Sequence, residues 1–311
     1  MNDGAGGERV EPAAQVVVEI ARLARDASIE IGVHDLRYLD ASTLFLPPGQ
    51  RLYVSFLPQQ SWDETEHTCR AVRRAGFEPV PHIAVRRIPS TQALERLLYN
   101  LVRDAQVREV LLIAGDYKLA SGPYASASDV LRAGVLGEVG LERVSFAGHP
   151  EGHPTVPLEE IRRAELEKAT IAADLGLEAT FVTQFFFQPV PFLKWVGEMR
   201  ARGVRSRIVA GLAGPATIGT LFRFALRCGV GPSIRALGSR ARSVTALAAE
   251  HGPQHVIRTL AEAHVASSAG FDGLHFFGFG GYLRTCDWVN RVAHGRFSLD
   301  ASGFTVASRS A

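Results

Sequence analysis

The chain has few cysteines, and those few are poorly placed for cross-linking or for metal binding. Only three of its 311 residues are cysteines: Cys69, Cys228 and Cys286. They are far apart, odd in number and in no CxxC pair, which argues against both a disulfide framework and a thiolate metal site. We therefore expect a protein of the reducing cytoplasm.

Long apolar runs and an excess of one charge are also missing. No window reaches about 18 consecutive apolar residues, and no hydrophobic segment follows the polar N-terminal stretch "MNDGAGGERVEPAAQ". The formal net charge is only +2, from charged residues that are interspersed rather than gathered into a basic stripe. We therefore expect neither export nor a membrane span, and a small molecule rather than a nucleic acid as partner.

Two common catalytic motifs are absent as well. No GxGxxG opens a helix after a strand, so a nucleotide bound in the Rossmann manner is not indicated. GxSxG is absent too, which removes the usual signal of a Ser/His/Asp hydrolase. The function must therefore be sought in other polar residues.

What the sequence does contain is a regular alternation of strand-like and helix-like segments, typical of βα units on a parallel sheet. Ser61 and Ser90 stand where helix N-caps are expected, and Gly76 where the first of these helices ends. Eight βα units match a (β/α)8 TIM barrel, a fold of roughly 250 residues. The predicted strands are "SIEIGV" (28–33), "RLYVSF" (51–56), "EPVPHIAV" (78–85), "EVLLIAG" (109–115), "RVSFAG" (143–148), "ATFVTQFFF" (179–187), "RIVAGL" (207–212) and "GLHFFGF" (273–279).

One α/β barrel accounts for nearly the whole chain. We assign residues 1–27 to an N-terminal tail and leading helix, residues 28–296 to the barrel, and residues 297–311 to a C-terminal tail. The first dozen residues and the last stretch, "DASGFTVASRSA" (300–311), are expected to be frayed ends. A longer helical stretch from about residue 232 to 269 predicts extra helices before the last strand.

Polar residues and glycine pairs stand at the ends of the predicted strands. In a TIM barrel the active site is built from the C-terminal ends of the strands. A functional site is therefore expected there. In chain order these residues are Glu30, Ser55, His82, "AGD" (114–116), "GHPEGHP" (148–154), Gln184, "GLAGP" (211–215) and "FGFGG" (277–281).

Two acidic residues can each be interpreted in two ways. Glu30 lies between Ile29 and Ile31, so the period of two turns it away from its apolar neighbours, toward the barrel interior or mouth. It is either the partner of an Arg or Lys at the rim or a general acid whose pKa is raised by burial. Asp116 follows Gly115, which indicates either an ordinary turn or a carboxylate beside a closely approached ligand.

The stretch "FVTQFFFQ" (181–188) has the character of a buried strand, yet it carries Thr183 and Gln184. An unpaired buried amide costs about 1–3 kcal/mol. Gln184 should therefore have a partner in the protein or point into a cavity where a ligand is the partner.

The "GHPEGHP" loop offers His149, Glu151 and His153 at alternating positions. A metal site would need a further strong ligand on a rigid element, and His82 is the only nearby candidate. The prolines hold the loop in one shape, which favours a loop that grips a cofactor through its imidazoles and backbone amides. We therefore predict cofactor contacts and no metal.

Taken together, these motifs resemble those of a known family. "PHIAVR", the Gly-Asp after the fourth strand, "AGHPEGHP" and "VTQFFF" follow in this order, and the pattern resembles the FAD-containing barrels of the 5,10-methylenetetrahydrofolate reductases from about Ser28 to Phe277. The resemblance implies an oxidoreductase that interconverts 5,10-methylenetetrahydrofolate and 5-methyltetrahydrofolate. It also implies FAD as cofactor, NAD(P)H as co-substrate and a homo-oligomer.

The resemblance further implies roles for individual residues. Glu30 would protonate N10 of the folate, Asp116 would hydrogen-bond the pterin and tune the flavin, and Gln184 would contact folate or nicotinamide. The residues that would line FAD are Ser55, His82, Ile113, Ala114, Gly115, Ser126, Ala127, Ala147, His149, His153 and Lys168, the last through the phosphates.

The chain also departs from the family pattern. "IGVHD" follows Glu30 where the family has a Phe-Phe-Pro-Pro run, and a family Arg, Tyr and Arg are replaced by Ala114, His149 and Gly281. These changes fall on cofactor and folate contacts. They leave two alternatives open: a relative that works mainly in the oxidative direction on methyltetrahydrofolate from demethylation, with a weakly held flavin or none, and a folate- or flavin-binding barrel without turnover.

Overall fold

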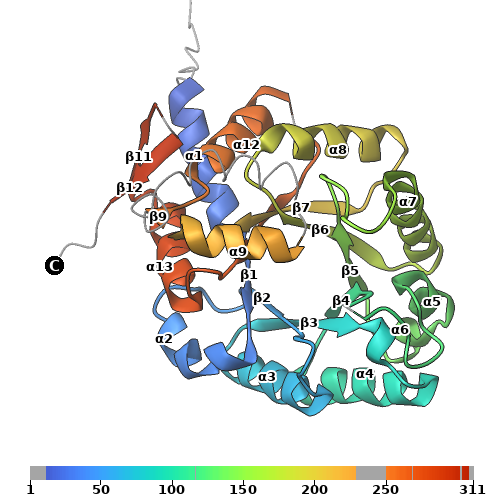
Figure 1. The fold of residues 1–311 in the computed structure, drawn as a ribbon. Coiled ribbons are helices and arrows are strands. Elements are labelled where there is room, and N and C mark those ends of the chain that lie inside the picture. Colours follow the sequence, from blue (N-terminus) through green and yellow to red (C-terminus); the bar gives the residue numbers. More distant parts are fainter. Residues whose placement is uncertain (1–11, 116, 229–249, 268, 302, 308–311) are drawn as a thin grey trace, which may run out of the picture.

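A closed barrel of eight parallel strands forms the centre of the molecule. The computed structural model describes residues 12–115, 117–228, 250–267, 269–301 and 303–307. The strands follow the order β1-β10-β7-β6-β5-β4-β3-β2, and helices surround them (Figure 1). The predicted TIM barrel is thereby confirmed. Its strands are β1 (Ser28–Ile31), β2 (Arg51–Val54), β3 (Glu78–Ala84), β4 (Glu109–Ile113), β5 (Arg143–Gly148), β6 (Glu178–Phe185), β7 (Arg207–Ala213) and β10 (Gly273–Phe277).

The helices begin and end where their capping residues stand. The Ser61 hydroxyl accepts a hydrogen bond from the backbone N–H of Glu64, and Ser90 caps the next long helix in the same way. Gly76 follows the first of these helices, Trp62–Arg74, with φ of 87°, a conformation that favours glycine. The helices are α1 (Pro12–Arg25), η1 (Val33–Tyr38), α2 (Leu39–Ser42), α3 (Trp62–Arg74), η2 (Val85–Arg87), α4 (Thr91–Ala105), α5 (Ala127–Arg132), α6 (Val135–Glu138), α7 (Leu158–Asp174), α8 (Pro189–Ala201), α9 (Ile218–Cys228), α12 (Gln254–Ser267) and α13 (Tyr282–Ala293).

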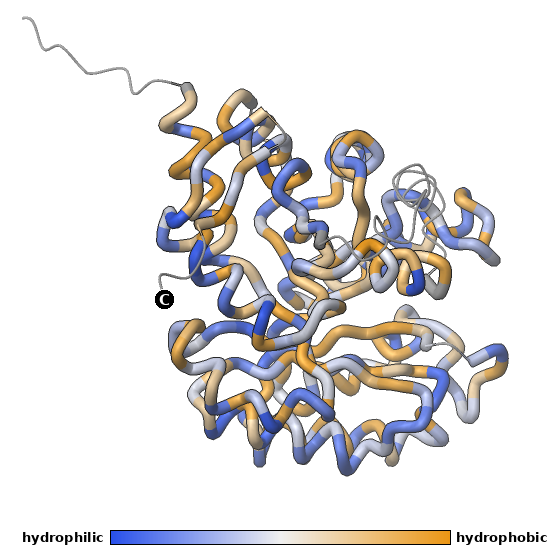
Figure 2. The backbone as a smooth tube through the Cα atoms, turned by 60° about the vertical axis from the view of Figure 1, so that its left-hand side comes forward, coloured by the Kyte–Doolittle hydropathy of each residue, from blue (hydrophilic) through white to orange (hydrophobic). Residues whose placement is uncertain are grey.

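The barrel wall separates an outer apolar layer from a small inner one. Ile29 and Phe276 belong to the large cluster between the strands and the helices, and the outer helices alternate hydrophobic and hydrophilic residues along their length (Figure 2). The inner cluster consists of Tyr53, Val80, Leu111, Val182 and Val209, with Ile113 packed against it. Because neighbouring positions on a strand face opposite sides, residues two positions along from these also point inward.

The closed end of the barrel is held by charge pairs. Glu109, at the start of β4, is buried and accepts a hydrogen bond from the Tyr53 hydroxyl at 3.1 Å. The guanidinium groups of Arg51 and Arg143 lie 3.8 and 3.7 Å from its other oxygen. Three strands are therefore tied together beneath the inner cluster.

Strand β6 has an irregularity at the two polar residues of "FVTQFFFQ". The pairing with β7 shifts between Val182 and Phe185, as it does at a β-bulge. There the Thr183 hydroxyl accepts a hydrogen bond from the backbone N–H of Gly211 at 2.8 Å. The Thr183 hydroxyl thus takes the place of a backbone carbonyl as the acceptor for this N–H. The bulge also changes the direction of the Gln184 side chain.

The C-terminal tail contains two short strands. Phe297–Asp300 (β11) and Gly303–Val306 (β12) form an antiparallel hairpin, so the frayed end predicted for residues 300–311 is wrong for Gly303–Val306. The rings of Phe297 and Phe304 pack 4.9 Å apart, and Phe304 also meets Trp288 of α13. This apolar anchor holds the hairpin.

The insertion before β10 is bounded by a short ribbon of β8 (Ala216–Thr217) and β9 (Glu250–His251). Of the extra helices predicted for 232–269, α12 is present, while residues 229–249 lie outside the described part of the chain. Across the described residues, no helix is both long and apolar enough to cross a membrane.

Gly211→Ala should lower the free energy of unfolding by about 1–3 kcal/mol, since an added Cβ would lie 2.1 Å from the Thr183 carbonyl oxygen. Gly197→Ala is the matched control: Gly197 is an exposed residue inside α8 with no atom within 4 Å of the new Cβ, and helix propensity predicts a gain of about 0.5–1 kcal/mol. Urea denaturation of both variants is the measurement. Equal changes in the free energy of unfolding of the two variants would show that the bulge is not tightly packed.

Candidate active site

Glu30 lies inside the barrel mouth without a cationic partner. Its neighbours Ile29 and Ile31 are fully buried on the opposite face of β1, whereas the Glu30 side chain keeps 22% of its surface exposed. Among the described residues, no Lys or Arg pairs with it, and its Oε2 atom lies 4.0 Å from Nε2 of His82 on β3. The described residues therefore do not support the interpretation of Glu30 as the ion-pair partner of an Arg or Lys at the rim.

The surroundings of Glu30 favour its protonated form. Burial, together with the negative charge of Asp35, raises the pKa of Glu30 from 4.5 to about 8. Burial lowers the pKa of His82 from 6.5 to about 4, so this imidazole is neutral at pH 7. The mouth thus holds an uncharged acid next to an uncharged base.

His82 has an unused hydrogen-bonding atom. Its Nε2 is buried and has no hydrogen-bond partner among the described residues. Its ring meets Tyr53 edge-on at 6.2 Å, and Tyr53 meets His275 of β10 at 4.8 Å. The polar rings fill the barrel centre, and the unused nitrogen is available to a group that enters the mouth.

Gln184 does not behave as a satisfied core amide. Its side chain is partly exposed and makes no hydrogen bond within the described chain. Val182, two positions earlier, belongs to the inner cluster. The bulge therefore leaves the amide at the mouth, where a ligand would be its partner.

The loop after β5 is anchored by a carboxylate that the sequence did not reveal. Glu165 of α7 is 1% exposed and accepts hydrogen bonds from the His149 backbone N–H at 2.9 Å, from Arg162 at 3.0 Å and from the Trp195 indole at 3.0 Å. Arg162 in turn donates to the carbonyl of His149 at 3.0 Å. The signal in the sequence is an acid and a base, Glu165 and Arg162, on a helix face that otherwise carries the apolar residues Ile161, Ala169 and Ala172.

These contacts keep Glu165 ionised and bring it close to an imidazole. The pKa of Glu165 is lowered: burial alone would raise it, but the hydrogen bonds from the Trp195 indole and the His149 backbone N–H and the charge of Arg162 outweigh burial. Nδ1 of His149 lies 3.8 Å from the carboxylate and is buried without a hydrogen-bond partner among the described residues. His153, by contrast, is exposed and contacts Thr155 of its own loop.

The remaining residues expected at FAD divide into two groups. Ser55, Ile113 and Ala147 face the barrel interior: Ile113 packs on the inner cluster, and Ala147 is paired with Val182. Ser126 and Ala127 instead begin α5, where the Ser126 hydroxyl is used in a capping box with Asp129. The structure therefore brings only part of the set to the mouth.

Gly115 and Lys168 also differ from expectation. Gly115 has φ of 83°, but a Cβ there would lie 3.1 Å from Ala84 and 3.2 Å from the Tyr117 ring. The groups that come close to this glycine are therefore side chains of the protein itself. The Lys168 ammonium lies over the rings of Phe146 and Phe181, in the layer between α7 and the barrel. Burial lowers the pKa of Lys168 to about 8. Ala114 precedes this turn, and Asp116 lies outside the described residues.

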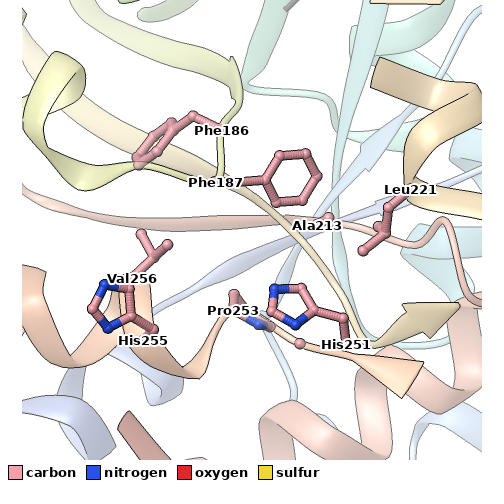
Figure 3. Close-up of a pocket in the computed structure, with 9 residues that line it drawn as sticks. Phe186, Phe187, Ala213, Leu221, His251, Pro253, His255 and Val256 are labelled. Carbon is pink, nitrogen blue, oxygen red and sulfur yellow. The ribbon is translucent and has the colours of Figure 1, made fainter. Parts of the chain in front are cut away.

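A small apolar cavity borders the mouth between β6, β7 and the insertion. Its volume is about 20 Å³, which is room for one water molecule and not for an aromatic ligand. Phe187, Leu221 and His251 face this space (Figure 3). Next to it lies a cluster of partly buried phenylalanines that includes Phe277 and Phe279.

No group of three or more His, Cys, Asp or Glu residues within the described ranges is arranged to hold a metal ion.

Glu30→Gln should stabilise the protein increasingly as the pH rises. A carboxyl whose folded pKa is raised stabilises the fold below its unfolded pKa, and this stability is lost as the pH rises through the folded value. The variant's advantage should therefore widen from about pH 5 to about pH 8 and then level off, at roughly 2–4 °C of melting temperature per kcal/mol. Thermal melts across this range test it, with the exposed Glu178→Gln as control. Parallel curves for Glu30→Gln and wild type would mean that Glu30 is ionised at neutral pH.

No protein-family model matches this chain. It is 27% identical over 165 residues to a 5,10-methylenetetrahydrofolate reductase of Pectobacterium carotovorum subsp. carotovorum, a match that covers 52% of this chain and 53% of the relative. The match thus spans about half the length of that curated relative.

Among solved structures, the chain resembles a protein from Clostridium thermocellum that is described as binding two copies of 5-methyl-5,6,7,8-tetrahydrofolic acid. The TM-score is 0.54 at 11% identity, and the alignment covers 86% of this chain and 93% of that one. At this identity the likeness concerns the fold. The chain is thus similar in sequence to a 5,10-methylenetetrahydrofolate reductase over about half of its length, and its closed eight-stranded barrel agrees with that similarity.

Proposed function

We propose that the chain interconverts 5,10-methylenetetrahydrofolate and 5-methyltetrahydrofolate, with NAD(P)H as co-substrate and Glu30 as the general acid. The observation that carries the proposal is an uncharged carboxylic acid at the barrel mouth, next to a neutral imidazole and with no cation paired to it in the described chain. Such an acid has its proton at neutral pH, which is what general acid catalysis requires.

The reaction needs a proton at one step only. The bond between the bridging methylene carbon and N10 breaks as Glu30 gives its proton to N10, and an iminium ion forms at N5. Hydride from the reduced nicotinamide then adds to the methylene carbon and gives the methyl group. In the oxidative direction the methyl group loses hydride, and the Glu30 carboxylate takes the proton from N10 as the ring closes.

Two further residues are suited to bind rather than to react. The Gln184 amide at the bulge of β6 can both donate to and accept from the edge of a pterin or nicotinamide ring. Asp116, which lies outside the described residues, keeps its proposed role at the pterin. Neither group is needed for the proton step, so we expect them to act on binding.

FAD fits the site at its ring end and not at its phosphate end. The buried, unpartnered Nε2 of His82 is the kind of atom that a polar heteroaromatic edge would satisfy. Lys168, expected at the phosphates, instead faces two phenylalanine rings, and the Arg162 guanidinium is used by Glu165 and backbone carbonyls. When bound, FAD would relay hydride between NAD(P)H and the folate, but no step above depends on it.

This partial fit favours the relative with a weakly held flavin over a tightly bound flavoenzyme. It leaves the direction of flux to experiment. Against a barrel that binds folate without turnover stands Glu30 itself, since a binding protein gains nothing from burying an unpaired acid at the cost of desolvation.

Glu30→Gln should slow folate turnover by about 10²–10⁴-fold, because the amide keeps the size of the side chain and removes the proton that N10 needs. We would measure NAD(P)H-linked oxidation of 5-methyltetrahydrofolate and reduction of 5,10-methylenetetrahydrofolate, with and without FAD, and the affinity for 5-methyltetrahydrofolate by calorimetry.

Affinity should stay within a few fold of wild type. A loss of binding as large as the loss of rate would mean that Glu30 holds the ligand rather than donating a proton. Wild-type protein that binds the folate and never turns it over would establish the non-catalytic barrel.

Added FAD and added riboflavin should raise the melting temperature to a similar extent. The flavin ring, which both ligands share, can hydrogen-bond at the mouth, whereas Lys168 and Arg162 are not placed to bind the FAD phosphates. At 100 times Kd either ligand would add about 2.7 kcal/mol of stability. His82→Phe, which keeps an aromatic ring and removes Nε2, should weaken both effects. A much larger effect of FAD than of riboflavin would show that the phosphates are held after all, and no effect of either would remove flavin from the proposal.

A further inference from the structure

The C-terminal hairpin has an open strand edge. The Ala307 N–H donates to the Arg296 carbonyl at 2.9 Å, and hydrogen-bonded pairs alternate with non-hydrogen-bonded pairs along an antiparallel ribbon. Phe297 and Leu299 of β11 therefore direct their N–H and C=O groups away from β12. No hydrogen bond from elsewhere in the described residues reaches these groups.

This edge lies on the outside of the molecule. The hairpin contacts α12 and α13 mainly through β12: Arg258 of α12 donates to the Gly303 carbonyl. Trp288 of α13 meets the Phe304 ring. The hairpin stands beyond the helices that surround the barrel (Figure 1). Exposed edge strands are often protected from pairing by a lysine, a proline or a bulge, and β11 has none of these.

A groove of about 950 Å³ borders β11. Its walls include Arg296, Phe297 and Ser298 on the hairpin, and Leu44 and Phe45 after α2. The Leu44 side chain is 80% exposed. The groove therefore leaves room for an extended segment beside the strand, with an apolar side chain near it.

The sequence "RFSLD" (296–300) is complementary to itself in the antiparallel direction. When Ser298 lies opposite Ser298 of a second copy, Arg296 of each chain faces Asp300 of the other. Phe297 then faces Leu299, and each such pair exchanges both of its N–H···O bonds across the two open edges. The Arg296–Asp300 pairs fall at non-hydrogen-bonded positions, where side chains lie closest.

Other registers do not satisfy both conditions. A shift of one residue would set the open N–H and C=O groups of one copy against groups that β12 already uses in the other. A shift of two residues would keep the hydrogen bonds but separate Arg296 from Asp300. Backbone and charge therefore select the same register.

The two faces of such a ribbon would match as well. Phe297 and Leu299 share a face of the hairpin with Phe304, whose ring lies 4.9 Å from that of Phe297. The Asp300 carboxylate lies on the opposite face, where it accepts a hydrogen bond from the Thr305 hydroxyl at 2.6 Å. In a pair of hairpins the apolar side chains would adjoin on one face and the charged pairs on the other.

We propose that β11 is an interaction surface for a second copy of this chain, in which the two β11 strands pair antiparallel about a twofold axis at Ser298, with reciprocal Arg296–Asp300 ion pairs. Both copies use the same surface, so the assembly closes as a dimer. Stable interfaces usually bury about 1,200–2,000 Å², and a pair of short strands buries less, so the dimer should be weak and dissociate on dilution. The inference is independent of the proposed function, since no hairpin residue belongs to the proposed site.

The test is the oligomeric state of the full chain, measured by sedimentation equilibrium over a wide range of protein concentrations. Wild-type protein should dimerise as the concentration rises. Arg296→Asp should raise the dissociation constant of the dimer roughly 10–100-fold, because both attractive pairs become repulsive, and Asp300→Arg should do the same. Arg205→Asp makes the same charge change at an exposed arginine outside the hairpin. This matched control should leave the dissociation constant unchanged.

Mixing the two charge variants separates this register from a general effect of charge. The Arg296→Asp and Asp300→Arg proteins should dimerise weakly alone and should form a heterodimer together, since every facing pair then has opposite charges. Leu299→Pro removes an N–H that β12 does not use, so the hairpin should remain while the dimer weakens. Thermal melts check that each variant is folded.

Three outcomes would overturn the proposal. Wild-type protein could stay monomeric at every concentration. A dimer could form that Arg296→Asp and Leu299→Pro leave intact, which would place its interface elsewhere. The mixture of the two charge variants could dimerise no better than its parts, which would rule out the Arg296–Asp300 pairing.

Discussion

The site depends on an acid that has been kept away from positive charge. The Glu30 carboxyl stands at the barrel mouth, where His82, 4.0 Å away, is neutral and a second carboxylate, Asp35, adds negative charge. Both conditions disfavour ionisation. A single Lys or Arg within a few ångströms would reverse them, so the placement of cations elsewhere in the fold matters as much as the placement of Glu30.

The other buried carboxylates show the contrast. Glu109 at the closed end is paired with Arg51 and Arg143, and Glu165 on α7 is bonded to Arg162 and to two N–H donors. These two acids stabilise the fold because their charges are compensated. These two carboxylates thus have their cationic partners at the closed end and in the outer layer, whereas Glu30 at the mouth has none among the described residues.

The sequence predicted those features that depend on local periodicity. All eight strands were found because apolar runs of strand length alternate with capped helices, and Glu30 was found because the period of two is strict in a short strand. Gln184 stood out as an amide in an apolar run. The bulge itself was not predicted, since it depends on Thr183 finding the N–H of Gly211 on a neighbouring strand.

Features that need distant elements to meet were missed. The Glu165 network joins α7, the loop after β5 and α8, and the stacked rings of Phe224 and Phe279 join α9 to the turn after β10. Lys168 was predicted at the FAD phosphates from the family resemblance. Its side chain instead lies on the face of α7 that packs against the barrel wall. The C-terminal hairpin was missed because its two short strands depend on contacts with distant elements, Trp288 of α13 and Arg258 of α12.

The clamp on the loop after β5 has a consequence for the thermodynamics of binding. Both the N–H and the carbonyl of His149 are fixed from α7, and Gly148 is closed in by Trp195, whose ring would lie 2.8 Å from an added Cβ. The backbone of this loop has therefore already lost its conformational entropy during folding. A ligand that binds against it causes no further loss of backbone entropy in the loop. Across the mouth, the rings of Phe277 and Phe279 pack against other phenylalanine rings and are only partly buried, so ligand binding on that side would include the entropy change of rearranging these side chains.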